Sequence, residues 1–247
     1  MATWRWFKRC WPTKADVNAK RADVDGSDTA LTLACSASHW EVARVLLEAG
    51  ANVNAMTPTG HTALIEAAGR GNLAMVQALL AAKAGVTARG TGGATPLIIA
   101  SERGRAEVVR LLLTAKADVR AEGNDGKTAL MSAPAGGPPL EVMQALLAAE
   151  ADVNAKQGAN SFDQVTVLIP PQNGGPKWVT PSDKVTALML ASQNGHLEVI
   201  QALLAAKADV NARQRDGSAA LMLALQNNHP EVAKLLTSAI AAGPAGK

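Results

Sequence analysis

The apolar residues of this chain recur at a fixed interval, marked most clearly by a Thr-Ala-Leu or Thr-Pro-Leu triplet. The triplet starts at Thr29, Thr62, Thr95, Thr128 and Thr186, and a relic follows at Ala219. Successive starts are 33 residues apart, except that 58 residues, or one period plus an insertion of 25, separate the fourth from the fifth. Such a period is typical of a solenoid, in which each unit buries its apolar face only against its neighbours.

Within each unit, the pattern predicts two short antiparallel helices and a turn. The threonine can cap the first helix, and Leu and Ala follow it at helical spacing. A Gly or Asn ends that helix, and a Glu such as Glu107 or Glu198 opens the second helix near its positive dipole end. The second helix carries a buried Val-x-x-x-Leu-Leu stripe. A turn such as Asp-Val-Asn-Ala, beginning at Asp209, then leads to the next unit.

This unit resembles the ankyrin repeat, because five to six units satisfy that family's pattern in phase. The resemblance covers about residues 15–240 apart from the insertion, and it implies an all-α ankyrin-repeat solenoid of stacked helix-turn-helix units with finger loops. One departure is that the family's His after the Thr-Pro-Leu step is absent, so apolar packing is expected to replace its hydrogen bonds. The residues at this place are Thr32, Ile65, Ile98, Met131, Met189 and Met222.

The repeat divides the chain into five parts. We expect an N-terminal capping helix or half repeat at 1–14, repeats one to four at 15–155, an insertion in a finger loop at 156–183, repeats five and six at 184–240, and a disordered tail at 241–247. Prolines at 134–139 predict a shortened first helix in the fourth repeat.

The insertion contains two β-type runs, at 164–169 and 177–180, joined by Pro- and Gly-rich turn material. This order predicts a β-hairpin. The alternative is a floppy surface excursion, since long insertions in loops are tolerated. Phe162, Leu168, Ile169 and Trp178 argue against pure disorder. Whether these side chains contact the array or a partner stays open, with contact to the array slightly favoured.

Composition and charge narrow the function classes. The net charge of +3 on 25.4 kDa gives no support for nucleic-acid binding. Two cysteines without clustered spacing favour a reducing compartment, here the cytoplasm. No apolar stretch is long enough to span a membrane, and the N-terminus lacks the apolar core of a signal peptide. Three tryptophans among Arg5, Lys8 and Arg9 nevertheless permit an alternative function, a membrane-associated adaptor held by the N-terminus.

No catalytic, cofactor or metal site is indicated. Gly126-Lys-Thr128 lacks the upstream Gly of a phosphate-binding loop, because Ala121 stands there. His39, His196 and His229 share one slot between the two helices, which is a structural recurrence, and no Cys/His cluster has zinc spacing. The chain is therefore predicted to be a non-enzyme without cofactors or metals.

Positions that do not recur remain for binding. The family resemblance places them at the finger tips and the ends of the first helices, on the concave face. Interface anchors are enriched in Trp, Tyr and Arg. The predicted function is a monomeric scaffold that binds an unidentified protein, and the candidate binding residues are Arg70, Arg89, Arg103, Lys127, Trp178, Asn194, Arg213 and Arg215.

Overall fold

The computed structural model of the chain describes residues 16–20, 28–133, 139–157, 167–168, 178–179, 184–214 and 216–242. The predicted N-terminal capping helix, the prolines at 134–138, most of the insertion and residues 243–247 lie outside these ranges.

The described helices form antiparallel pairs, one pair for each predicted repeat, joined by a short turn. The pairs are α2 (Ala30–Ser36) with α3 (Trp40–Glu48), α4 (Ala63–Arg70) with α5 (Leu73–Ala81), α6 (Pro96–Glu102) with α7 (Ala106–Thr114), α8 (Ala129–Ser132) with α9 (Pro139–Ala148), α10 (Ala187–Gln193) with α11 (Leu197–Ala205), and α12 (Ala220–Gln226) with α13 (Pro230–Ala241).

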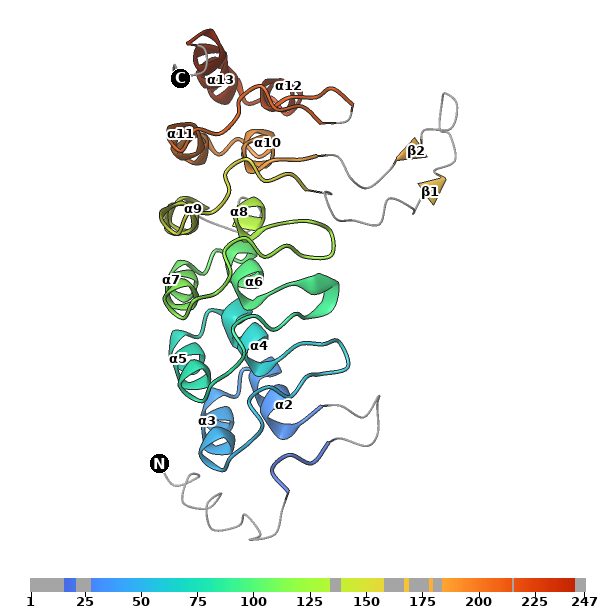
Figure 1. Cartoon of the computed structure of the whole chain (residues 1–247), viewed down its shortest axis with the longest axis vertical. Helices are drawn as coiled ribbons and strands as arrows, with labels where there is room; N and C mark the ends of the chain where they lie inside the picture. The colour runs from blue at the N-terminus through green and yellow to red at the C-terminus, as the bar shows by residue number, and fades with distance from the viewer. Residues whose placement is uncertain are drawn as a thin grey trace.

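The pairs stack into two parallel rows (Figure 1). The first helices of the pairs pack on one another from α2 to α12, and the second helices do the same from α3 to α13. The finger loops project from the side of the first helices (Figure 1), and a 3-10 turn, η1 (Thr91–Gly93), lies in one of them. The predicted all-α solenoid is confirmed.

The core consists of the leucines that recur with the period. The Leu of the triplet is at most 1% exposed in every described unit where its threonine is kept, at Leu31, Leu64, Leu97, Leu130 and Leu188. Leu79, Leu112 and Leu203 on the second helices are 0% exposed. Each leucine lies between neighbouring pairs, so its burial depends on the stack and not on one unit.

The threonine that opens each triplet caps the first helix. Its hydroxyl accepts a hydrogen bond from the backbone N–H three residues later, for example 3.3 Å from Ile98 N to Thr95 Oγ1. The same cap forms at Thr29, Thr62, Thr128 and Thr186. Ala219 has the same extended backbone but no side-chain cap, so α12 begins without this bond.

Left-handed residues end both helices of a unit at fixed places. After the first helix the residue is usually glycine, as at Gly71 with φ of 79°. After the second helix it is more often a lysine, as at Lys83, Lys116 and Lys207, with φ of 64° to 65°. A side chain in this conformation is strained. Hydrogen bonds at the helix end hold it there, as where Lys83 N donates to Leu80 O and Ala84 N donates to Leu79 O, each at 2.9 Å.

The place of the missing family His is filled by packing, as expected, in most units. Ile65, Ile98, Met131 and Met189 are buried apolar side chains. Thr32 is also buried, but its hydroxyl accepts from Thr29 N and donates to Thr29 O, each at 3.0 Å. Met222 is the exception at 44% exposed, and Leu225 on the same helix is 61% exposed. The expectation is therefore wrong for the last unit, because no described element packs against that face of α12.

The fourth repeat has the shortened first helix that its prolines predict, since α8 is 4 residues long and α6 is 7. The insertion that follows is closed at its base, where Gln157 N donates to Val185 O at 2.9 Å. Within it, β1 (Val167–Leu168) pairs antiparallel with β2 (Trp178–Val179), which is the pairing that the predicted β-hairpin requires.

Asparagine side chains tie successive turns together. The Oδ1 of Asn18 accepts from Asn52 N, and that of Asn54 accepts from Gly85 N at 2.8 Å. Asn154 does the same across the insertion: its Oδ1 accepts from Asp209 N at 2.7 Å, and its Nδ2 donates to Lys207 O at 3.4 Å. The fifth repeat is thereby aligned on the fourth despite the inserted chain.

Ala219→Thr should stabilise the protein. The backbone at this place already has the geometry of the five threonine caps, so a new hydroxyl can accept from the N–H at Met222, and we expect a gain of about 1 kcal/mol in the free energy of unfolding. Urea denaturation of the native chain and the variant measures this difference in the free energy of unfolding. Ala219→Val is the control, because it adds the branched shape without the acceptor. An equal gain from valine would contradict the capping explanation.

Asn154→Ala should weaken the junction between the fourth and fifth repeats. Two hydrogen bonds are lost, so we expect a loss of about 1–2 kcal/mol or a separate early unfolding step of repeats five and six. Asn211 occupies the same place in the next turn, and in the described residues its side chain makes no hydrogen bond, so Asn211→Ala is the matched control. Equal effects of the two substitutions on urea unfolding would refute the proposed role of Asn154.

Candidate protein-binding surface

The finger loops of repeats two to four are joined into a continuous rim. Thr91 Oγ1 donates to Thr59 O, and Asn124 N donates to Gly92 O at 2.6 Å. Arg89 Nη1 donates to Glu122 O at 2.8 Å. These bonds run from each finger to the next. We call the three loops, which carry Thr59, residues 89–92 and residues 122–124, the finger rim. Loops bonded in this way present their exposed tips at a defined spacing.

The finger rim is also fixed to the first helices below it. His61 Nδ1 lies 2.8 Å from Glu66 Oε1, and both side chains are about a quarter exposed. His61 belongs to the second finger and Glu66 to α4. This contact therefore fixes the second finger to its own first helix.

Several predicted binding residues are held by their own surroundings. Arg213 Nη1 donates to Gly217 O at 3.0 Å within one finger, and Asn194 Nδ2 donates to Leu190 O at the end of α10. Lys127 Nζ lies 3.5 Å from Asp125 Oδ2. Arg89, as described, bonds the neighbouring finger. Their roles in binding stay predictions. All four side chains also have a structural use, because three donate hydrogen bonds to backbone carbonyls and Lys127 forms an ion pair.

Two predicted residues cannot be placed in a site. Trp178 belongs to β2, and its side chain lies outside the description of the structure. Arg215 lies outside the described residues altogether.

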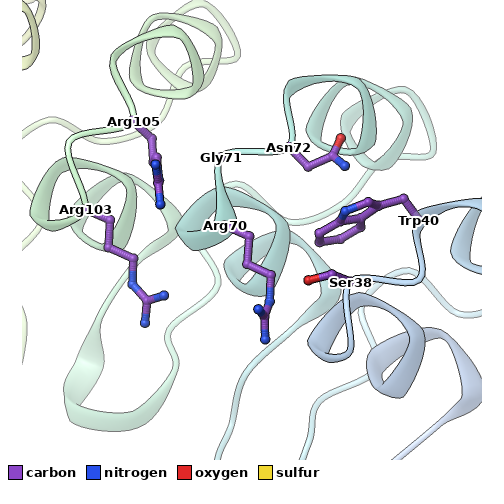
Figure 2. Close-up of a pocket in the computed structure, with 7 residues that line it drawn as sticks. All are labelled: Ser38, Trp40, Arg70, Gly71, Asn72, Arg103 and Arg105. Carbon is purple, nitrogen blue, oxygen red and sulfur yellow. The ribbon is translucent and has the colours of Figure 1, made fainter.

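The other two predicted residues, Arg70 and Arg103, lie together on one cleft (Figure 2). The cleft has a volume of about 470 Å³ and crosses the first three repeats at the turns between their helices. We call it the arginine cleft, and it is lined by Ser38, Trp40, Arg70, Gly71, Asn72, Arg103 and Arg105.

Helix ends position the side chains of the arginine cleft. Arg70 is the last residue of α4, and Arg103 follows α6 directly. Arg105 precedes α7, and Trp40 is the first residue of α3. Residues at helix ends project away from the packed stripe, so three guanidinium groups and one indole reach the same opening from consecutive repeats.

Two of the arginines are anchored to the preceding repeat. Arg70 Nη2 donates to Ser36 O, and Arg105 Nε donates to Gly69 O at 3.3 Å. Gly71 makes room for the second bond: it has a positive φ, and a Cβ there would lie 2.7 Å from Arg105 Cδ. His229 uses the equivalent place in the last repeat, donating to Gln193 O at 3.1 Å.

The arginine cleft is a local excess of positive charge. In the part of the chain that the structure describes, none of its three arginines forms an ion pair with a carboxylate. On the second helices, by contrast, Arg110 pairs with Glu107 at 2.5 Å and Lys234 pairs with Glu231 at 2.9 Å. Arg110 and Lys234 are thus each neutralised by a glutamate on the same helix, whereas the cleft arginines are not.

Sequence reasoning missed Arg105 and Trp40. Arg105 occupies the slot that holds a histidine in three other units, so an arginine there is a departure from the recurrence. Trp40 occupies the first position of the second helix, where the other units have Leu, Ala or Pro. Both departures are visible in the aligned repeats and could have been found by the rule that non-recurrent residues bind.

The described His, Cys, Asp and Glu side chains do not gather into a metal site. Among the described residues there is no group of three or more His, Cys, Asp or Glu arranged to hold a metal ion. None of the described helices combines the length and apolar character that crossing a membrane requires.

Cys35 is fully buried. Burial, with a smaller contribution from the negative charge of Glu66, raises the pKa of its thiol from 9.0 to about 12.

Cys35 should therefore be unreactive in the native protein. A pKa of about 12 lowers the thiolate fraction at pH 8 about thousandfold relative to a thiol of pKa 9.0, so we expect negligible alkylation by iodoacetamide until the chain is unfolded in guanidinium. Peptide mass spectrometry separates Cys35 from Cys10. Because the folded-state pKa is the higher one, the buried thiol should stabilise the fold fully below pH 9, and less as pH rises from 9 toward 12. Rapid native labelling of Cys35 would contradict this description.

Comparison with protein families supports the architecture directly. The family description "Ankyrin repeats (3 copies)" matches residues 8–90, 86–157 and 155–243. A search of curated proteins finds no match. The three matches cover most of the chain, with stacked helix pairs and finger loops as their structural counterpart, so the chain belongs to the ankyrin-repeat family.

Proposed function

We propose that this protein is a non-catalytic scaffold that binds another protein through its finger rim and the ends of its first helices. Ankyrin repeats generally act as protein-interaction modules. The observation that carries the proposal is the finger rim itself, in which bonds between neighbouring loops hold exposed side chains such as Met56, 46% exposed, in a fixed array. A preorganised surface loses little conformational freedom on binding.

The second helices are a poorer candidate for the binding face. On α3, α7 and α13 the basic side chains pair with glutamates of the same helix, as Arg44 does with Glu41 and Glu48. Paired surface charges add little to affinity. The mild net charge of +3 also favours a protein partner over a nucleic acid.

The test compares capture of partner proteins from lysate of the native host. In the finger variant, Met56→Asp and Asn124→Asp place two negative charges on the rim. In the control, Gln77→Asp and Gln201→Asp add the same charge to α5 and α11. We expect the finger variant to lose captured partner about tenfold and the control to match the native chain, as measured by quantitative mass spectrometry. Equal capture by both variants, or no protein captured by the intact chain, would overturn the proposal.

The insertion is tested separately by deleting residues 159–182. This deletion gives Asp152 and Thr186 the same spacing as Asp118 and Thr128, and it keeps the bond between Gln157 and Val185. Loss of a partner that the finger variant retains would place binding in the insertion. An unchanged set of partners would show that the insertion, including Trp178, is dispensable for binding.

A further inference from the structure

The arginine cleft combines features that the rest of the described surface does not bring together. Arg70, Arg103 and Arg105 come from two consecutive repeats and have no carboxylate partner among the described residues. Trp40, half-buried at one end of the cleft, adds an aromatic surface (Figure 2). An unneutralised arginine cluster next to an indole is suited to a ligand that carries both negative charge and apolar side chains.

We propose that the arginine cleft binds an acidic segment of the protein partner, with carboxylate side chains on Arg70, Arg103 and Arg105 and an apolar side chain on Trp40. This inference rests on the proposed protein-binding function and names the chemistry of the partner at one site.

Two of the three arginines, Arg70 and Arg105, are restrained by the repeat that precedes them. A guanidinium group has five N–H donors. Arg70 uses one on Ser36 O, and Arg105 uses one on Gly69 O, so most donors of both groups remain for a ligand. Because these bonds restrict the side chains before binding, less conformational entropy is lost when a carboxylate arrives. Carboxylates match the planar donor fork of arginine in bidentate geometry.

The repeat geometry also sets the spacing of the acidic residues. Arg70 and Arg103 occupy the same place in consecutive repeats, whose first helices pack directly on each other. Packed helices lie about 8–10 Å apart, and an extended peptide rises about 3.3 Å per residue. A peptide lying along the stack would therefore present carboxylates to both arginines if its acidic residues were about three positions apart.

The cleft is confined to the N-terminal half of the array. In the fifth and sixth repeats the places of Arg70 and Arg103 hold Asn194 and Asn227, and the place of Arg105 holds His196 and His229. The same turns there lack the permanent charge of arginine. We therefore expect an acidic segment to bind over repeats one to three and not elsewhere along the row of turns.

The experiment uses the full chain and a fluorescein-labelled peptide with a glutamate at every third residue, separated by Ala-Pro and preceded by one leucine. Fluorescence anisotropy should show saturable binding that weakens with added NaCl. Arg103→Gln should weaken binding about threefold to tenfold, and the triple variant with Arg70→Gln and Arg105→Gln about thirtyfold or more. Arg110→Gln on α7 is the charge-matched control and should leave affinity unchanged. Arg103 makes no hydrogen bond within the described residues, so its variant should keep the native unfolding curve.

Four results would overturn the inference: no binding of the glutamate peptide, equal binding of a peptide with glutamine in place of glutamate, equal loss with Arg110→Gln, or binding only of a phosphoserine peptide or a single-stranded oligonucleotide. Failure of this site is distinguishable from failure of the proposed function. If the triple variant still captures the native partner from lysate and the finger variant does not, the scaffold function stands and the cleft inference is wrong.

Discussion

Direct packing of each first helix on the first helix of the next unit is the contact from which the remaining geometry follows. The side chain six residues after the triplet start lies between two such helices, and it is small inside the array. Cys35, Ala68, Ser101 and Ser192 are all 0% exposed at this place. Helices that approach this closely hold the loops at their ends in a fixed register. The finger rim and the arginine cleft are both composed of such loops, so each depends on small side chains buried between the helices.

The fold could be predicted almost completely from the sequence, because recurrence separates structural positions from the others. The threonine caps, the buried leucines and the aspartate turns each follow from local chemistry repeated in phase. The exceptions are places where a residue departs from what its sequence position predicts. Lys83, Lys116 and Lys207 adopt a left-handed backbone that glycine prefers, and no propensity argument places a lysine there. Met222 follows the sequence rule for a buried residue, but lacks the neighbour that would bury it.

The candidate site was less accessible to sequence reasoning, because a hydrogen bond between repeats depends on distances that no single unit specifies. Arg89 and Arg213 look free when the repeats are aligned, yet each donates to a backbone carbonyl of a finger. Arg105 is the opposite case. Its place in the repeat suggests a structural role, and it does donate to Gly69 O, but its guanidinium group also lines the arginine cleft. One polar residue in this array can therefore both hold neighbouring repeats together and face a ligand. An alignment of the repeat sequences does not show which of the two roles a residue has.

The closed base of the insertion has a consequence for how this protein can change. Gln157 and Val185 meet there, and Asn154 aligns the flanking turns, so the residues on either side of the insertion lie next to each other. Lengthening such an excursion adds only a slowly growing entropic penalty. Mutations can therefore change the sequence of the insertion without disturbing the helices on either side. The junction is thus a natural grafting point, at which evolution or an engineer could exchange recognition peptides while every repeat is kept intact.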